Sequence, residues 1–494
     1  MNKQRTLLIA LLAAVQLCTA CGISDSPGDV TTTDQQTVDA APSTTEAAET
    51  TIAPPNIPAI DGGGDEFRML GRSVDNTFPI HEFMITEVTG DTVDNAVYKR
   101  NRYLEDKYKI KIVADEATAT EIRETMQRNI QVNDSTYDLY MPSIRNAFIL
   151  TLEGALYNIE DIPYVNIDNP WWQTRMLDNF SISNANFFLI GDMNPSIFNA
   201  IGVIYLNEKV AEDNNIPNVY QTVRDGKWTL DLMHEYSTAV TRDLDGDQIV
   251  GITDMWGFIT GNFAWQTLFY GSGESFSAKD SQDIPSLTWD TEKNINVITK
   301  ITELLNDESA TLLTNQAQFK GVNAQATFKE NRALFRQEYI YNIYQIRDME
   351  TNFGLLPAPK YDESQTNYYS AVHTTHSSAT CVPTTNNRIE LTGAILEDMA
   401  YQSYITIRPA FYDNTLVGRF ARNEDTVEML NLIYANINTD LSLAMATTGL
   451  TIDADMRAIY TEDRSEFMSA IAASKGLNAT IIETNVSKIL ELLK

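Results

Sequence analysis

The order of strand-like and helix-like segments after Glu66 is the feature that most constrains the fold. The segment "EFRMLGRS" has strand character, "KIKIV" (109–113) alternates like a strand, and "YDLYM" (137–141) is a third short strand pattern. One helix is expected within 94–108 and another around 117–130. The first carries a stripe at helical spacing, made of Val97, Arg100, Asn101, Leu104 and Tyr108. This β-α-β-α-β order predicts a mostly parallel sheet covered by helices.

Later segments extend the α/β pattern. The segments "NFFLIGD" (186–192) and "GVIYLN" (202–207) are typical of strands, and an aromatic strand is expected in "GNFAWQTLFYGSG". A helix is expected in "WTLDLMHEYSTAVT", with Thr229 as its N-cap. Its predicted apolar stripe consists of Leu232, Tyr236, Ala239 and Val240. Further helices are expected at 291–306 and through most of the chain after Ile389.

The N-terminus has the pattern of an export signal. Lys3 and Arg5 precede an apolar run from Leu7 to Leu17, which is too short to cross a bilayer as a helix. Such a run is typical of the apolar region of a secretory signal. The tripeptide Thr19-Ala20-Cys21 resembles a bacterial lipobox, in which the cysteine is lipidated. We therefore predict a signal peptide at 1–20 and a lipid anchor on Cys21 that holds the protein at the outer face of the cytoplasmic membrane.

The segment that follows Cys21 is predicted to be a tether. Residues 22–64 contain no lysine, arginine or aromatic residue, so they cannot bury enough apolar surface to offset the entropy of ordering. As a flexible coil the tether, 21–64, would span roughly 35–40 Å. Cys381 is then the one cysteine left to the folded body, which excludes an intramolecular disulfide. We expect it to be a small buried apolar residue.

Length and charge narrow the function classes. A chain of 494 residues has room for more than one compact unit. Its formal net charge of -31 disfavours nucleic acid or an anionic membrane face as an electrostatic partner.

The loop "DLDGDQIVGITD" (243–254) resembles a calcium-binding loop. Three aspartates occupy its positions 1, 3 and 5, a backbone carbonyl can serve at position 7, and a carboxylate stands at position 12. These ligands are Asp243, Asp245, Asp247, Ile249 and Asp254. Glycine stands at position 4 rather than at position 6, which is Gln248. A sensor needs helices that open, and one loop alone favours a structural calcium ion; the alternative is a solvated Asp-rich turn.

Motifs spread along the chain resemble one family of proteins in their number and order. They are "YDLYM", "GALYNIED", "NPWW", "FFLIGD", "YLNEKVAED", "DGKWTLDLMHEY", "DLDGD…DMWGF", "FKENRALF", "FGLLPAPKY" and "TGAILEDMA". The chain resembles the bacterial extracellular solute-binding proteins of family 1, the lipoprotein receptors of ABC importers, which often bind carbohydrates. The resemblance covers about 66–494.

The resemblance implies a periplasmic-binding-protein-like α/β fold with two lobes, a hinge and a ligand cleft between the lobes. Lobe one would comprise 66–192 plus 372–420, and lobe two 193–371 plus 421–494. The chain would cross between them near Asp192–Asn194 and Ala371–Thr375. Hinge closure of this kind changes the backbone angles of few residues and buries the ligand between rigid bodies.

A sugar site needs aromatic rings for the C–H faces and planar polar side chains for the hydroxyls. Mapping by motif places such residues near the cleft, and for each aromatic residue the alternative is core packing. Trp171 and Trp256 are expected to be packing residues. The spacing of the two histidines also resembles a metal site, but no third ligand cluster accompanies them. The predicted ligand-binding residues are Ser143, Arg145, Trp172, Asp192, Asn194, Asn199, Trp265, Tyr270, Tyr339, His373 and His376.

Three functions remain open at the level of sequence. The first is a non-catalytic receptor that delivers a solute, best described as a sugar or oligosaccharide, to the permease of an ABC importer, acting as a monomer. The second is a secreted carbohydrate-active enzyme, which would also place carboxylates in an aromatic cleft. The third is a receptor for a peptide or another non-sugar solute. The chain has no G-x-S-x-G motif and no phosphate-binding loop, which favours a receptor.

Overall fold

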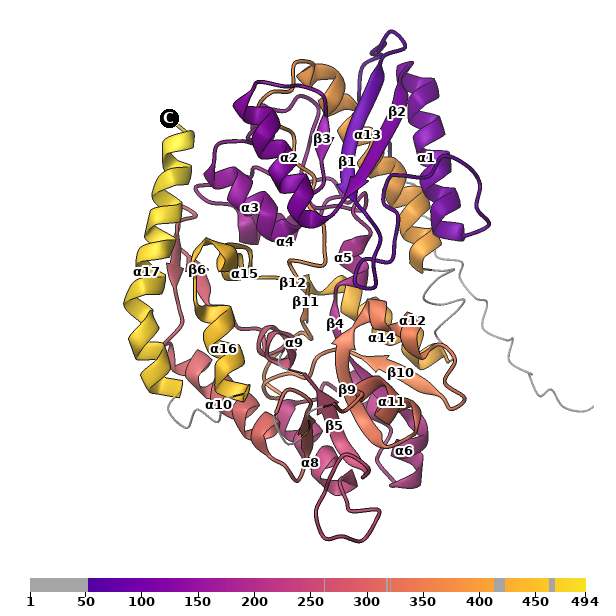
Figure 1. Cartoon of the computed structure of the whole chain (residues 1–494), viewed down its shortest axis with the longest axis vertical. Coiled ribbons are helices and arrows are strands. Elements are labelled where there is room, and N and C mark those ends of the chain that lie inside the picture. Colours follow the sequence, from indigo (N-terminus) through magenta and orange to yellow (C-terminus); the bar gives the residue numbers. More distant parts are fainter. Residues whose placement is uncertain (1–51, 262, 317–318, 320, 413–422, 462–466) are drawn as a thin grey trace, which may run out of the picture. The chain divides into compact units, whose positions relative to one another are not determined.

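The first sheet has the predicted parallel order. The computed structural model describes residues 52–494 except 262, 317–318, 320, 413–422 and 462–466. Strands β1 (Glu66–Arg72), β2 (Lys111–Ala117) and β3 (Leu139–Tyr140) form a sheet in the order β2-β1-β3, with both neighbours parallel to β1 (Figure 1). Helices α1 (Thr92–Tyr108) and α2 (Ala119–Gln131) connect these strands.

Local capping explains where these helices begin. The Asp91 side chain accepts from the amides of Val93 and Asp94, and Thr118 forms a capping box with Glu121. The predicted stripe of α1 is buried at all five positions. It packs against α13 (Ile389–Pro409), where Lys107 Nζ lies 2.7 Å from Asp398 Oδ2.

The second sheet is mixed. Its order is β10 (Phe353–Leu356), β4 (Gly202–Asn207), β9 (Ala333–Tyr339), β5 (Trp256–Thr260) and β8 (Thr311–Leu313). Strand β4 runs antiparallel to β9 and β10, whereas β5 runs parallel to β8 and β9. With helices packed on both sheets, the α/β class is confirmed.

The remaining helices are α3 (Ile144–Leu152), α4 (Thr174–Phe180), α5 (Ser196–Asn199), α6 (Glu208–Asp213), α7 (Val219–Arg224), α8 (Leu230–Val240), α9 (Ala264–Gly271), α10 (Glu292–Asn306), α11 (Ala324–Lys329), α12 (Ile343–Ile346), α14 (Glu424–Ala435), α15 (Leu441–Met445), α16 (Ile452–Thr461) and α17 (Phe467–Leu492). The remaining short strands are β6 (Ser277–Lys279), β7 (Pro285–Leu287), β11 (Ser370–Ala371) and β12 (Ile437–Asn438).

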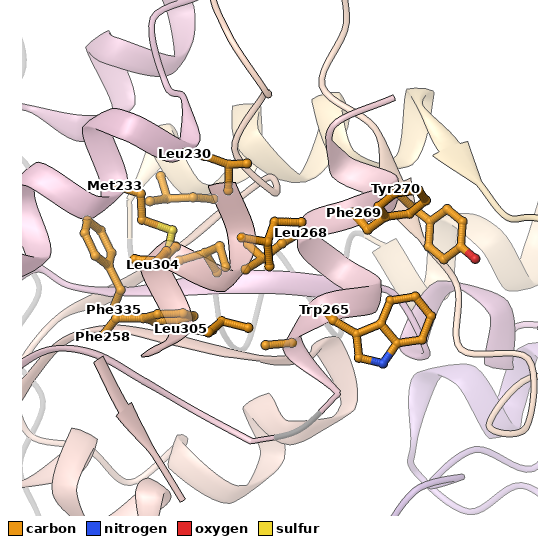
Figure 2. Close-up of a cluster of buried hydrophobic side chains, with 14 of the residues drawn as sticks. Leu230, Met233, Phe258, Trp265, Leu268, Phe269, Tyr270, Leu304, Leu305 and Phe335 are labelled. Atoms are coloured by element: carbon orange, nitrogen blue, oxygen red, sulfur yellow. The ribbon is translucent and has the colours of Figure 1, made fainter. Parts of the chain in front are cut away.

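A large apolar core covers one face of the second sheet. Side chains of α8, α9 and α10 meet Phe258 of β5 and Phe335 of β9 there (Figure 2). Thr229 caps α8 as predicted, by accepting from the amide of Leu232. The predicted stripe of α8 is only partly right: Tyr236 and Val240 are buried, but Ala239 is exposed, and Leu230 and Met233 complete the buried face.

Two strand predictions are wrong. Residues 186–192 form no strand, because they change partner along their length: Leu189 pairs with Thr380, and Gly191 pairs with Trp172. The predicted aromatic strand is helix α9, in which Trp265, Leu268 and Phe269 follow the spacing of a helical face.

The N-terminal predictions fall largely outside the described residues. The signal peptide, Cys21 and the tether up to residue 51 lie there. The end of the tether is attached to the body, since the amide of Gly62 donates to Tyr108 O and that of Gly64 to Lys109 O, both at 2.7 Å. Among the described residues, no helix is both long and apolar enough to cross a membrane. Cys381 is buried, as predicted.

Candidate ligand-binding site

Two segments that link the sheets run side by side. Leu189 forms an antiparallel bridge with Thr380, and Ile201 forms one with Val372. Between these bridges, Asn194 Nδ2 donates to Ser378 Oγ (3.0 Å) and to Thr380 Oγ1 (3.1 Å). These segments contain the two crossings that the resemblance implies, near Asp192–Asn194 and Ala371–Thr375.

The buried carboxylate of Glu82 joins both linking segments to the stretch of chain that follows β1. Glu82 accepts from the amide (3.1 Å) and hydroxyl (2.7 Å) of Ser196 and from the hydroxyl of Ser378 (2.6 Å). Burial raises the pKa of Glu82 above its usual value, although the serine hydrogen bonds oppose this. The linking segments are therefore anchored at one shared point.

Four aromatic rings gather where these segments meet the end of β9. We call Tyr339, Tyr341, His373 and His376 the Tyr339 cluster. The rings of Tyr339 and Tyr341 stack with centroids 5.5 Å apart, and those of His373 and His376 with centroids 4.0 Å apart. Tyr339 meets His373 edge-on at 5.1 Å, and the Tyr341 hydroxyl lies 3.1 Å from His376 Nδ1. Such an assembly offers both ring faces and polar edges, as a sugar site requires.

Three arginines from different elements surround the turn between the histidines. Arg72, at the end of β1, donates to Thr375 O (2.7 Å), and Arg145 Nε of α3 donates to Thr374 Oγ1 (2.9 Å). Arg457 of α16 lies over the ring of Phe263, 5.3 Å from its centroid. That ring in turn meets His373 edge-on at 5.7 Å.

One carboxylate joins these elements to the second sheet's helices. Asp453 of α16 lies 3.5 Å from Arg145 and 3.3 Å from Arg457, and it accepts from Gln266 Nε2 of α9 at 3.0 Å. It thus links α3, α9 and α16 through side chains alone.

The histidines are neutral at pH 7. Burial, together with the nearby Arg72 and Arg145, lowers the pKa of His376 to about 4, while Asp75 opposes the shift. Burial also holds the pKa of His373 well below its usual value, with His376 and the arginines acting in the same direction. The rings therefore serve as uncharged stacking and hydrogen-bonding groups.

Two buried polar side chains next to the cluster have no hydrogen-bond partner among the described residues. They are the hydroxyl of Tyr339, whose residue is 6 % exposed, and the amide of Asn199, whose residue is 2 % exposed. Leaving such groups unpaired costs roughly 1–3 kcal/mol each. A ligand or water that pairs these groups would recover that energy.

The structure brings together only part of the predicted ligand set. Arg145, Tyr339, His373 and His376 converge on the Tyr339 cluster, and Asn199 lies on α5, next to the residue whose carbonyl accepts from the His373 amide. Three others are held elsewhere in the fold: Ser143 caps α3, while Asp192 and Asn194 are fully buried in the first linking segment. Burial raises the pKa of Asp192 to about 7, and Arg408 opposes the shift.

Trp172 lies away from the cluster. Its indole Nε1 donates to Glu397 Oε2 at 3.0 Å, while that of Trp171 donates to Glu397 Oε1 at 3.1 Å. Gly191 packs so closely on the Trp172 ring that an added Cβ would lie 2.6 Å from a ring carbon. The expectation that Trp172 stacks on a ligand is therefore corrected: both indoles are structural.

Trp265 and Tyr270 are corrected for a different reason. Both are 0 % exposed and belong to the core on the second sheet (Figure 2). A ring with no exposed surface cannot stack on a sugar, and the error follows from taking helix α9 for a strand. Trp256 is likewise fully buried, as predicted for a packing residue.

Sequence reasoning missed several residues around the cluster, namely Arg72, Phe263, Tyr341, Asp453 and Arg457. The i, i+4 spacing of Asp453 and Arg457 on a helix was an available signal for a pair. Nothing in their local sequence indicates that α16 comes close to Arg145 of α3 and to Phe263, because those contacts depend on tertiary structure.

The aspartate loop brings together three of the five predicted metal ligands. Carboxylate oxygens of Asp243, Asp245 and Asp247 lie within 4.8 Å of one another, a donor set that fits a hard cation. Asp254 is not in this group: it is buried, and its oxygens accept from the amides of Leu244 (2.8 Å) and Gly251 (2.6 Å). Gln248 has φ +70°, the left-handed conformation that glycine usually supplies at this position.

Comparison with known proteins finds similar structures. No family model matches the sequence, and no curated protein matches it. Solved structures do. The cyclic α-maltosyl-1,6-maltose binding protein from Arthrobacter globiformis aligns with a TM-score of 0.60 at 10% identity, over 85% of this chain and 100% of that one. UspC from M. tuberculosis gives 0.58 at 13% identity, over 84% and 100%.

A third similar structure is the ABC substrate-binding protein Lmo0181 from Listeria monocytogenes, solved in complex with cycloalternan. It aligns with a TM-score of 0.53 at 10% identity, over 87% of this chain and 99% of that one. At such identities the likeness bears on architecture: the chain has the two-lobe α/β fold of these substrate-binding proteins.

Proposed function

We propose that this chain is the solute-capturing component of an ABC importer and that it binds a saccharide at the Tyr339 cluster. The observation that carries the proposal is the cluster itself. Stacked aromatic rings lie beside a buried hydroxyl and a buried amide that have no partner among the described residues. Similar solved proteins are described as binding a cyclic maltosyl-maltose and cycloalternan, which agrees with a saccharide here.

Capture would proceed by closure of two lobes, 66–192 plus 372–420 and 193–371 plus 421–494. The linking segments fastened by Glu82 would serve as the hinge. Asp453 supports this proposal, because it faces Arg145 on α3 and accepts from Gln266 on α9. A bound solute between these elements would favour the closed arrangement.

We infer that the chain is a receptor and not an enzyme. A glycosidase needs two carboxyl groups placed across the scissile bond, one of them protonated. Asp453, the carboxylate that faces Arg145, is already shared between Gln266 and two arginines. Release of a shortened sugar from an oligosaccharide by the purified chain would reverse this inference.

The proposed setting is outside the cell. After removal of residues 1–20, lipidated Cys21 and the tether 21–64 would hold a monomer near the ABC permease that receives the solute. Membrane fractionation of the wild type and of Cys21→Ser checks the anchor. The anchored form should be found with membranes, and the variant should be released.

The aspartate loop is proposed to bind one structural calcium ion. Asp243, Asp245 and Asp247 would supply its carboxylate ligands, and the ion would neutralise charges that otherwise repel one another. Ile249 O remains a predicted ligand. The ion would steady the turn that leads into β5 and would take no part in solute binding.

The experiment that tests the saccharide proposal is calorimetric titration with a panel of sugars and peptides, repeated on Tyr339→Phe. Losing the hydroxyl should weaken saccharide binding roughly threefold to tenfold. It should not destabilise the free protein, because this hydroxyl has no hydrogen-bond partner among the described residues. Tyr108→Phe is the matched control: its hydroxyl is bonded to Ala394 O, so that variant should lose stability and keep its affinity. Binding of peptides alone would contradict the proposal.

A further inference from the structure

The Tyr339 cluster offers a ligand many hydrogen-bond donors and few acceptors. Arg145 is mostly buried, with a side chain 11% exposed. Its Nε is bonded to Thr374 Oγ1, but its terminal nitrogens form no hydrogen bond with any described residue and lie no closer than 3.5 Å to Asp453. The Tyr339 hydroxyl is likewise without a partner within the described part of the chain. Both groups can donate to a ligand, and the unpartnered Oδ1 of Asn199 can accept.

The other acceptors near these groups are already in use. Asp453 accepts from Gln266, and the carbonyls of Thr374 and Thr375 accept from the Arg145 amide and from Arg72. His373 Nδ1 lies 2.8 Å from the Thr375 hydroxyl. A neutral sugar presents hydroxyls that both donate and accept. Many of the sugar's donors would find no acceptor at this site.

The charges around the turn point in the same direction. Three guanidinium groups lie in this region, those of Arg72, Arg145 and Arg457. Two carboxylates pair with them: Asp75 with Arg72 at 3.2 Å, and Asp453 with Arg145 at 3.5 Å and with Arg457 at 3.3 Å. One guanidinium charge is left in excess, although the whole chain carries a formal net charge of -31. Burial is the main cause that lowers the pKa of His373, and Arg145, Arg72 and Arg457 lower it further. Concentrating guanidinium groups at one place in an acidic protein favours a negatively charged group there.

We propose that the saccharide bound at the Tyr339 cluster carries an anionic group, a carboxylate or a sulfate, that pairs with Arg145. The planar guanidinium donates to two oxygens of such a group at once. The aromatic rings of Tyr341 and Phe263 would contact the C–H faces of the sugar. This inference rests on the proposed saccharide function and narrows its substrate class.

The test is a calorimetric comparison of the full chain with three sets of oligosaccharides of equal length: hexuronates, sulfated hexoses and neutral hexoses. At least one of the anionic sets should bind with an affinity about tenfold or more above that of the neutral set. That preference should shrink as salt is added, because screening weakens charge pairing. The carboxylate and sulfate sets show which group the site takes.

The variant Arg145→Gln, read beside Arg128→Gln, assigns the effect to one residue. Arg128 lies exposed on α2, so its variant is the matched control and should bind as the wild type does. Arg145→Gln should lose the anionic preference, so its affinity for the anionic sets should fall by about tenfold or more relative to its affinity for the neutral set. Neutral sugars that bind as well as anionic ones overturn this inference while leaving the saccharide proposal intact. The absence of binding to every saccharide overturns both, and the salt series on the wild type decides the question if Arg145→Gln does not fold.

Discussion

Replacing Glu397 by glutamine should destabilise the protein without changing its affinity for solute. The Glu397 carboxylate is fully buried and accepts four hydrogen bonds. Asn169 Nδ2 (2.6 Å) and Trp171 Nε1 (3.1 Å) donate to Oε1, while Trp172 Nε1 (3.0 Å) and the Asn166 amide (3.3 Å) donate to Oε2. A glutamine keeps one acceptor oxygen and turns an NH₂ group toward the other pair of donors.

The magnitude follows from those two donors. Each donor left unmatched costs roughly 1–3 kcal/mol, and removing the buried charge returns part of this. Burial raises the pKa of Glu397 above its usual value, so the charged form is disfavoured there. Removing the charge therefore recovers part of the lost free energy. We expect a net loss of about 2–4 kcal/mol in the free energy of unfolding.

Urea denaturation at pH 7, followed by tryptophan fluorescence, measures the loss. Glu390→Gln is the control on the same helix, since Glu390 is exposed and accepts from the Tyr164 hydroxyl. The control should lose no more than about 1 kcal/mol. If Glu397→Gln is as stable as the control, or if it abolishes solute binding while staying folded, the structural role assigned to Trp171 and Trp172 is refuted.

Three further predictions concern the metal loop, the histidines and the hinge. Calcium at a hundredfold excess over its Kd should raise the free energy of unfolding of the wild type by about 2.7 kcal/mol, which a thermal shift measures. The variant Asp243→Ala/Asp245→Ala should lose this shift, and the control Asp106→Ala/Asp168→Ala, at two exposed positions, should keep it. A wild type whose stability does not respond to calcium contradicts the calcium proposal. The folded-state pKa of His376 lies near 4, below the usual 6.5, so its contribution to stability is present above pH 6.5 and declines as the pH falls toward 4. This contribution amounts to about 3 kcal/mol. The difference in the free energy of unfolding between the wild type and His376→Asn should narrow by that amount as the pH falls from 6.5 to 4. A difference that stays constant over this range contradicts the assignment. Ser378→Ala removes a 2.6 Å hydrogen bond to Glu82 and should lower the free energy of unfolding by about 1–3 kcal/mol. Thr480→Ala, at an exposed position of α17, should not, and urea denaturation of the two variants measures the difference.

The sequence predicted the parts of the fold that depend on local pattern. The first sheet, the stripe of α1 and the Thr229 cap all follow from spacing and capping chemistry. The strand at 186–192 and the aromatic strand were wrong, because short apolar runs do not distinguish strands from helices or linking segments. Tertiary contacts alone decide that Leu189 pairs with Thr380.

The candidate site was predictable where residues follow an ordered motif. Arg145 comes shortly after β3, and His373 and His376 lie in the second of the linking segments, so motif order located them. Burial could not be deduced in this way. Tryptophan suits a core as well as a sugar platform, and only the structure assigns Trp172 to Glu397 and Trp265 to the core.

The central claim is that solute binds at the Tyr339 cluster, and the histidine signals in NMR spectra test it most directly. The chain has four histidines, which gives a simple spectrum. His373 and His376 lie in the cluster, whereas His81 pairs with Glu116 and His234 with Asp307 elsewhere. Saturation with a bound saccharide should shift the ring signals of His373 and His376 and leave those of His81 and His234 in place. Saccharide binding with the first pair unchanged would contradict the account.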